Sequence, residues 1–389
     1  MSTFTPANSA EAVEAVRESK RLRPRGAGTK PALCAVDDET SILDLTGLSG
    51  ITEYDPGEYT FTALGGTPVA EVEEALGKNG QYLPFDPPLL DAGSTLGGTV
   101  AAGLSGPGRY RYGGVRDFLI GASFIDGDGR ELRGGGKVVK NAAGFDFPKL
   151  LTGSLGELGV LLELTFKVFP RKEAFATLEV ETGGFREALD TIALLNSSTE
   201  ELFALELRPP GTLELRIGGV ASVLQARLDR LRSLVNFPCV VVEADEDRWR
   251  AAGEFSWAGA GDSLVKAPAT LGVIEALDER LEELGAERRY GCGGSVAWIA
   301  WPAGESLADL EELLVESGTS GLILRSPGRT VASVFINRSP GPFEKRVRSV
   351  LDGPGTFSMR TAGQAGEESC STRYQPLTWE RRGPPCSAR

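Results

Sequence analysis

Residues 91–103 read Asp-Ala-Gly-Ser-Thr-Leu-Gly-Gly-Thr-Val-Ala-Ala-Gly, and this stretch decides how the chain is interpreted. Its four glycines let the backbone approach an anion closely, and its three hydroxyl side chains can donate hydrogen bonds. The spacing matches neither the Walker A loop nor the Rossmann fingerprint. The segment indicates a different diphosphate-binding loop, with the packing of small residues as the alternative interpretation.

Three further glycine-rich segments accompany this stretch within the first 170 residues. Residues 25–30 form a turn whose backbone N–H groups can converge on an anion. Residues 111–117 bring two arginines that could meet phosphates or form surface ion pairs with Asp117. Residues 140–160 combine polar groups with glycines that allow close approach to a flat ring. Taken singly, each segment is also compatible with an ordinary turn.

The composition narrows the possible chemistry. The chain has 389 residues, enough for two domains, and its net charge of −13 argues against a nucleic-acid partner. It contains no histidine, which excludes Ser-His-Asp and Cys-His catalysis and imidazole metal sites. Its five cysteines form no CxxC pair, and no apolar run approaches the length of a membrane span. We therefore expect a protein of a reducing cytoplasm.

The first 170 residues show a mixed pattern of secondary structure. We expect a helix over residues 9–20, capped by Ser9, and a strand near Leu22. A second helix should begin at Thr67-Pro68, with the proline at the first helical position. Residues 85–117 look irregular. Strands are expected over 118–125 and 160–169, and Pro170 marks a domain boundary.

The second half has the pattern of an antiparallel sheet covered by helices. A hairpin is expected around Pro209-Pro210-Gly211, where apolar and polar residues alternate on both sides. Further strands are expected near 175–180, 295–301 and 321–336, and helices near 185–195, 221–235, 272–284 and 306–317. Residues 359–389 are polar and without periodicity, so we expect a disordered tail.

The order and spacing of the glycine-rich segments resemble the FAD-binding domain of the vanillyl-alcohol oxidase and para-cresol methylhydroxylase (PCMH) superfamily over residues 5–170. Within it, they are most similar to the FAD-binding subunits of bacterial glycolate oxidases. The resemblance implies an α+β fold. Residues 1–170 would form a PCMH-type FAD-binding domain of two α/β subdomains, and residues 171–358 a C-terminal α+β cap domain with an antiparallel sheet.

The resemblance also implies which residues contact FAD. The first glycine loop and the Thr-Leu-Gly-Gly loop would hold the pyrophosphate, and the segment from Ser105 to Gly113 would line the flavin. The late Gly159-Val160 region would contact the isoalloxazine ring or the adenine. The implied set is Arg25, Gly26, Ala27, Gly28, Thr29, Lys30, Pro84, Asp86, Gly93, Ser94, Thr95, Leu96, Gly97, Gly98, Gly103, Ser105, Gly106, Arg111, Tyr112, Gly113, Arg116, Asp117, Lys140, Asn141, Phe145, Asp146, Gly153, Glu157, Gly159 and Val160.

The C-terminal region is less similar to this superfamily. Residues 291–294, Gly-Cys-Gly-Gly, stand where catalytic relatives often carry a glycine motif that contains histidine. No catalytic residue and no metal site can be assigned. With no histidine, and with Cys34 outside the family's attachment sites, FAD should be held noncovalently.

The implied function is that of the FAD-binding subunit of a glycolate oxidase or dehydrogenase complex. Glycolate would become glyoxylate, a paralogous FAD-linked subunit would be the catalyst, and electrons would pass to an iron–sulfur subunit. Such a hetero-oligomer would be cytoplasmic, with membrane contact only through its partners. One alternative is a self-sufficient FAD enzyme for another 2-hydroxy acid or alcohol, with Arg208, Arg325 or Lys266 as the cation. The other is a scaffold without cofactor.

Overall fold

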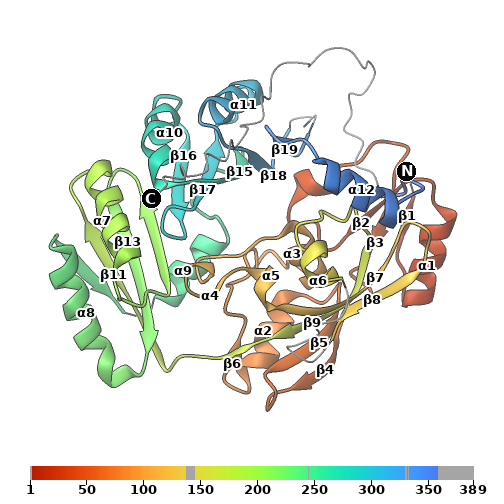
Figure 1. Ribbon diagram of the computed structural model, residues 1–389, viewed down its shortest axis with the longest axis horizontal. Helices are drawn as coiled ribbons and strands as arrows, with labels where there is room; N and C mark the ends of the chain where they lie inside the picture. The colour runs from red at the N-terminus through yellow and green to blue at the C-terminus, as the bar shows by residue number, and fades with distance from the viewer. Residues whose placement is uncertain (1, 137–144, 244, 329–330, 332, 358–389) are drawn as a thin grey trace, which may run out of the picture.

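The computed structural model describes residues 2–136, 145–243, 245–328, 331 and 333–357. The expected tail and two of the expected contacts, Lys140 and Asn141, lie outside these residues. The described residues form four sheets, of which the two largest have five and nine strands and are antiparallel (Figure 1). The α+β class is therefore confirmed.

A three-stranded parallel sheet opens the chain, in the order β1-β3-β2. Its elements are β1 (Thr3–Phe4), α1 (Ser9–Glu18), β2 (Leu22–Arg25) and β3 (Ser41–Asp44). The expected cap of α1 is wrong by one residue. Asn8, not Ser9, is extended, and its side chain accepts a hydrogen bond from Glu11 N at 3.0 Å.

A five-stranded antiparallel sheet follows, in the order β4-β5-β9-β7-β8. Its strands are β4 (Ile51–Asp55), β5 (Thr60–Leu64), β7 (Leu119–Ile125), β8 (Glu131–Gly135) and β9 (Val160–Lys167). The two strands expected from the sequence, β7 and β9, are confirmed, and the structure pairs them as antiparallel neighbours. Helix α2 (Val69–Gly77) packs into the same core, with Pro68 at its N-cap and not at its first helical position.

Residues 85–117, which we expected to be irregular, contain three short helices: α3 (Leu96–Ala102), α4 (Arg109–Tyr112) and most of α5 (Val115–Phe118). Helix α3 is delimited by local signals in the sequence. The Thr95 hydroxyl accepts from Gly98 N at 3.2 Å, and Gly103 ends the helix at φ +63°. Just before this region, β6 (Gln81–Tyr82) pairs with the distant β10 (Phe169–Pro170) in a small antiparallel sheet.

The second half forms a nine-stranded antiparallel sheet in the order β14-β11-β13-β12-β16-β17-β15-β18-β19. The strands are β11 (Ala174–Glu181), β12 (Ala204–Arg208), β13 (Thr212–Gly219), β14 (Cys239–Val242), β15 (Ser263–Pro268), β16 (Glu287–Gly291), β17 (Val296–Trp301), β18 (Gly321–Arg325) and β19 (Phe335–Ile336). The expected hairpin of β12 and β13 is confirmed. The single strand expected over 321–336 is instead two strands.

Four helices pack on one face of this sheet: α7 (Phe185–Ser197), α8 (Ala221–Val235), α10 (Leu271–Glu283) and α11 (Leu307–Glu316) (Figure 1). All four were expected, and the bounds of α8 agree with the prediction. Their apolar side chains and the inward residues of the strands form one core. The opposite face of the sheet is turned toward the first half of the chain, with α9 (Glu246–Gly253) beside it.

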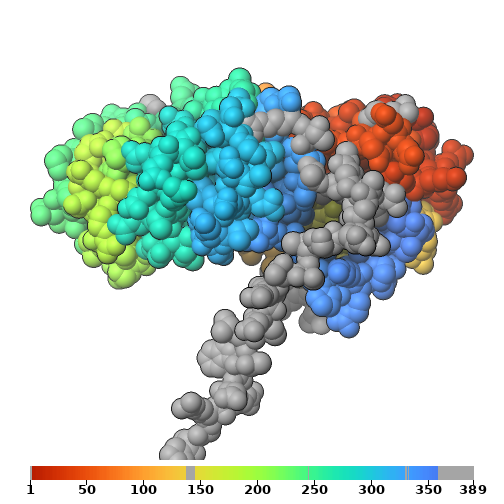
Figure 2. Space-filling model, turned by 90° about the horizontal axis from the view of Figure 1, so that it is seen from above, coloured from red at the N-terminus to blue at the C-terminus, as the bar shows by residue number. Residues whose placement is uncertain are grey.

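The last described segment returns to the first half. Helix α12 (Pro342–Leu351) and residues 352–357 lie beside α1 and the N-terminal sheet in both overall views (Figures 1 and 2). Leu22 N donates to Thr356 O at 2.8 Å, and fully buried Phe357 joins the α1 core. We had placed this segment with the second region; the domain boundaries themselves stay a prediction. No helix in the described ranges is long and apolar enough to cross a membrane.

Candidate functional site

A pocket opens between the loop that follows β2 and the start of α3. We call it the loop pocket, and residues 25–30 form one wall of it, opposite Thr95 and Gly98. The two walls touch, because a Cβ atom on Gly26 would lie 2.2 Å from the Thr95 hydroxyl oxygen. Gly28 has φ +71°, a conformation that favours glycine. The glycines that we singled out are therefore required by geometry.

The loop pocket offers backbone donors that no part of the described chain accepts. The N–H groups of residues 26–29 have no acceptor among the described residues. The first N–H groups of α3 differ, because Leu96 N donates to Thr67 O at 2.9 Å and Gly97 N to Gly65 O at 2.7 Å. The free donors therefore come from the first glycine loop, whereas the second one supplies close packing.

Two buried cations complete the loop pocket. Arg23 is 4% exposed and donates to the Leu33 carbonyl through Nη2, while its Nε and Nη1 find no partner among the described residues. Burial lowers the pKa of Arg23, and it lowers the pKa of Lys30 to about 8. Unpaired buried donors and cations are costly unless an anion satisfies them. This set of groups fits the diphosphate of FAD.

A second pocket lies where the flavin-side segment meets the nine-stranded sheet, and we call it the sheet pocket. Ser105, Gly106 and Arg109 line it from the first half of the chain. Tyr110, the next residue of α4, ties this segment to the sheet domain by donating to Asn196 Oδ1 at 2.9 Å. The opposite wall is the open face of the sheet. The pocket therefore joins the two halves of the chain.

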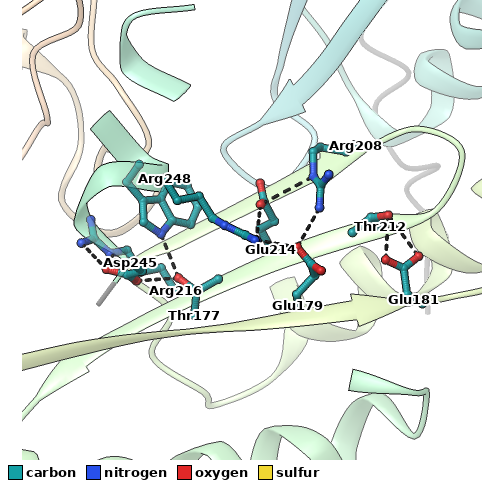
Figure 3. Close-up of polar contacts among 10 residues, drawn as sticks. Thr177, Glu179, Glu181, Arg208, Thr212, Glu214, Arg216, Asp245 and Arg248 are labelled. Carbon is teal, nitrogen blue, oxygen red and sulfur yellow. Dashed lines mark hydrogen bonds and ion pairs between the residues drawn. The ribbon is translucent and has the colours of Figure 1, made fainter. Parts of the chain in front are cut away.

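The open face of the sheet carries a row of three carboxylates. Glu179, Glu214 and Glu206 are cross-strand neighbours on β11, β13 and β12. Arg208 donates to Glu179 at 2.8 Å, and Arg248 donates to Glu214 at the same distance (Figure 3). Within the described chain, Glu206 forms no ion pair, although it is the member of the row that lines the sheet pocket. The arginines thus neutralise two carboxylates and leave the third free.

Burial next to Glu214 raises the pKa of Glu206 to about 8. The backbone N–H of Cys292 donates to its carboxyl group, which opposes the shift. The carboxyl group also covers Gly291, where a Cβ atom would lie 2.8 Å from Glu206 Oε1. Glu206 is therefore a positioned acid that is mostly protonated at neutral pH.

Two cations of the same sheet line the sheet pocket together with Glu206. Arg289 on β16 and Lys266 on β15 are both cross-strand partners of Trp298, so all three side chains share one face. Burial, with Arg109 nearby, lowers the pKa of Lys266 to about 8. Burial also raises the pKa of Cys292 to about 12, which keeps its thiol protonated. The sheet pocket is thus a cationic site with one neutralisable acid.

A third cavity, of about 240 Å³, lies between the same two halves and holds Asp86. Burial raises the pKa of Asp86 to about 6, and its carboxylate accepts from Gly108 N at 2.8 Å. Arg216 lines the same cavity and forms a buried pair with Asp245 at 2.8 Å (Figure 3). Of the expected FAD contacts, Asp86 therefore lines this third cavity, while its backbone carbonyl accepts from the N–H of Gly106, a residue of the sheet pocket, at 2.8 Å.

The structure brings some expected FAD contacts together and separates others. The loop pocket collects Arg25, Gly26, Ala27, Gly28, Thr29, Lys30, Thr95 and Gly98, and the sheet pocket collects Ser105 and Gly106. The linings of both pockets leave out the following residues of the expected set: Pro84, Gly93, Ser94, Leu96, Gly97, Gly103, Gly113, Gly153, Gly159 and Val160.

The remaining expected contacts have partners of their own. Arg111 pairs with Glu201 at 2.7 Å, and Arg116 donates to the Lys149 carbonyl. Asp117 accepts from Gly114 N and pairs with neither arginine. Tyr112 packs against Phe169 and Phe203, and the exposed Phe145 ring contacts Phe147. Asp146 caps α6 (Phe147–Leu151), and Glu157 pairs with Arg348.

Four pocket residues were missed by sequence reasoning: Arg23, Arg109, Glu206 and Arg289. Arg23 lies in a strand of alternating arginines, and only its burial distinguishes it from exposed neighbours. Cys34 lines the loop pocket as a half-buried free thiol. Burial raises its pKa despite the neighbouring cations, so it stays protonated.

Comparisons with known proteins point to FAD binding by the part of the chain that forms most of the loop pocket. Residues 2–135 match the family described as FAD binding domain. Over 151 residues the chain is 47% identical to the glycolate oxidase subunit GlcE of Escherichia coli (strain K12), covering 39% of this chain and 43% of that protein. Over 158 residues it is 33% identical to the glycolate oxidase subunit GlcD of Bacillus subtilis (strain 168), covering 40% and 33%. The chain thus aligns with less than half of each of these relatives.

A solved structure of an alkyldihydroxyacetonephosphate synthase is similar over much more of the chain. The TM-score is 0.69 at 14% identity, over 91% of this chain and 75% of that one. This similarity extends the shared fold well beyond the family match, into the nine-stranded sheet. The N-terminal part of the chain, residues 2–135, therefore matches an FAD binding domain, and FAD is the cofactor that this match indicates.

Proposed function

We propose that this chain, whose residues 2–135 match the FAD binding domain family, is the FAD-binding subunit of a glycolate oxidase or dehydrogenase complex. The observation that carries the proposal is the loop pocket, where free backbone donors meet the unpaired nitrogens of buried Arg23. The similarity to GlcE, a glycolate oxidase subunit, supports the choice of complex.

In this role FAD supplies the two-electron oxidation of an alcohol to a carbonyl. The chain contributes the diphosphate grip through residues 26–29, Arg23 and Lys30. Binding is noncovalent, because the chain has no histidine to form the usual tether and the Cys34 thiol stays protonated. Glu157, near Arg23 and paired with Arg348 of α12, fixes the C-terminal segment beside the same pocket.

The proposal includes partners. A paralogous FAD-linked subunit would oxidise glycolate, and an iron–sulfur subunit would accept the electrons. The five scattered cysteines of this chain support that division, since an iron–sulfur cluster needs closely spaced thiolates. Such a complex would be cytoplasmic, and any contact with a membrane would be made by the partners.

The test compares the chain alone with the chain co-expressed with the subunits encoded beside it. Glycolate is added anaerobically, and reduction of the flavin is followed by its visible absorbance. We expect slow or no bleaching of the chain alone and rapid bleaching in the complex. Equal, fast bleaching in both samples would contradict the role of a non-catalytic subunit.

A second candidate is favoured by the sheet pocket. An FAD enzyme that acts alone on another 2-hydroxy acid needs a cation for the carboxylate and an acid–base group for the hydroxyl. Lys266 and Glu206 meet that description. A screen of 2-hydroxy acids against the isolated chain decides between the candidates, because bleaching by one acid without partners would establish a self-sufficient enzyme.

A further inference from the structure

The C-terminal segment, residues 342–357, reaches the surroundings of the loop pocket at two points. It follows β19 of the nine-stranded sheet and returns to the first half of the chain, where α12 lies beside the N-terminal sheet (Figure 1). The carbonyl of Thr356 accepts a hydrogen bond from Leu22 N on β2 at 2.8 Å. Arg348 of α12 donates to the carboxylate of Glu157. The segment therefore contacts both β2 and the turn between α6 and β9.

The turn that carries Glu157 lies against β2, next to Arg23. Leu155 lines the loop pocket, and a Cβ atom on Gly156 would lie 3.7 Å from the ring of Pro24, the residue after Arg23. Glu157 is 8% exposed, and its negative charge opposes the effect of burial on the pKa of Arg23. Among the described residues, however, the ion pair of Glu157 is made with α12 and not with Arg23. A buried carboxylate is thus held close to Arg23 by a cation from α12.

The free donors of Arg23 depend on where that carboxylate is held. Nε and Nη1 of Arg23 find no partner among the described residues, and the proposed function assigns them to the diphosphate of FAD. A carboxylate can accept two guanidinium nitrogens at once, in a bidentate pair. If Glu157 were released from Arg348, it would therefore compete with the diphosphate for Arg23. Arg348 has a second carboxylate nearby, because Glu344 lies 3.7 Å from it.

We propose that Arg348 is a positioning residue for the cofactor, because it holds the Glu157 carboxylate on α12 and so keeps the guanidinium of Arg23 free for the diphosphate of FAD. Docking of the C-terminal segment and binding of FAD are then coupled, and the coupling acts in both directions. The inference rests on the proposed function only in that FAD occupies the loop pocket. It gives a role in cofactor binding to a helix outside residues 2–135, which match the FAD binding domain family.

The experiment is a double-mutant cycle on the full-length protein. Dialysis against a series of FAD concentrations, followed by the flavin absorbance of the retained protein, gives the dissociation constant of FAD. We expect Arg348→Met to weaken FAD binding about tenfold, because the released carboxylate takes up donors of Arg23. Glu157→Gln should bind FAD at least as tightly as the wild type, and in that background Arg348→Met should have no further effect. A merely structural role of Arg348 would weaken FAD binding by the same factor in both backgrounds.

The matched control is Arg346→Met, on the exposed side of the same helix, which should leave the dissociation constant of FAD unchanged. If Arg348→Met does not fold, Glu157→Gln decides, because weaker FAD binding by that variant overturns the inference. FAD binding that Arg348→Met leaves unchanged, or weakens equally in both backgrounds, also overturns this inference alone. A colourless wild-type protein would instead contradict the proposed function.

Discussion

The two pockets of this chain are built in opposite ways. The loop pocket uses the backbone of six consecutive residues, 25–30, with Gly26 where a side chain would collide and Gly28 at a positive φ. The sheet pocket uses side chains from α4, β12, β15 and β16, which lie far apart in the sequence. The first is specified locally, and in our proposal it recognises a diphosphate through N–H groups. The second depends on strand register and recognises charge. A substitution should therefore affect one pocket and spare the other.

The largest effect is expected from Gly26→Val. The new side chain would collide with the Thr95 hydroxyl and separate the two walls of the loop pocket. Overpacking of this kind costs about 1–3 kcal/mol of stability, and we expect FAD to be lost on purification. The ratio of flavin to protein absorbance measures it. Gly304→Ala, where a Cβ meets nothing within 4 Å, is the matched control and should stay yellow.

Arg23→Met separates cofactor binding from stability. Removal of the buried, partly unpaired guanidinium should weaken FAD binding about 10- to 100-fold. It should not lower, and could raise, the melting temperature of the FAD-free protein, because an uncompensated buried charge is removed. Arg21→Met is the control, since Arg21 pairs with Asp37 and Glu39 near the surface. Equal FAD affinity in both variants would show that Arg23 does not face the diphosphate.

The sheet pocket should respond to pH more steeply than the loop pocket. Burial lowers the pKa of Lys266 to about 8 and raises that of Glu206 to about 8. Below that pH Lys266 is charged and Glu206 neutral; above it Lys266 is neutral and Glu206 negative. Both changes disfavour an anion. When the full-length protein is titrated with acetate, which has no hydroxyl group to oxidise, proton NMR should show binding about tenfold weaker at about pH 9 than at about pH 7.

The other charged or titratable groups around the two residues are Arg109 on α4, Arg289 on β16, Cys292 in the turn after it, Glu214 on β13 and Asp86. Of these, Asp86 titrates lower, with a pKa near 6, and the Cys292 thiol near 12, so neither changes charge in this window. In the loop pocket Lys30 loses its charge in the same range, because burial lowers its pKa to about 8. FAD binding should therefore also weaken, but less than acetate binding, for which both Lys266 and Glu206 change charge. Acetate affinity that is flat across this range would contradict the assigned charges.

The smallest effect is expected from Tyr110→Phe. The variant loses the hydrogen bond to Asn196 that holds α4 against the sheet domain, worth about 1 kcal/mol of stability. Acetate binding should weaken modestly because Arg109 is less well held, and FAD content should not change. Chemical denaturation and the acetate titration measure the two effects. A loss of FAD would mean that the two pockets are more closely coupled than their construction indicates.

The sequence allowed prediction of features that are local. The bounds of α8 followed from leucines at helical spacing, and the hairpin of β12 and β13 from alternation around a proline turn. The loop pocket was also predicted, because residues 25–30 are contiguous. Strands β4 and β5 were missed, and so was α12, whose sequence is mostly polar and charged.

The sheet pocket could not be predicted, for a physical reason. Alternation shows that Glu206 and Lys266 lie opposite the apolar residues of their strands, but not which strands are neighbours. The order β12-β16-β17-β15 is set by packing between distant segments. Lys266 was considered only as one of several cations that could act on a substrate, and the register with Trp298 gives it its place.

The measurement that tests the central claim most directly is the flavin content of the full-length wild-type chain, purified from a host rich in FAD. The account predicts a yellow protein with about equimolar FAD, all of it released when the protein is denatured by acid or heat. A colourless protein would contradict the assignment of the loop pocket. Flavin that stays attached after denaturation would contradict noncovalent binding.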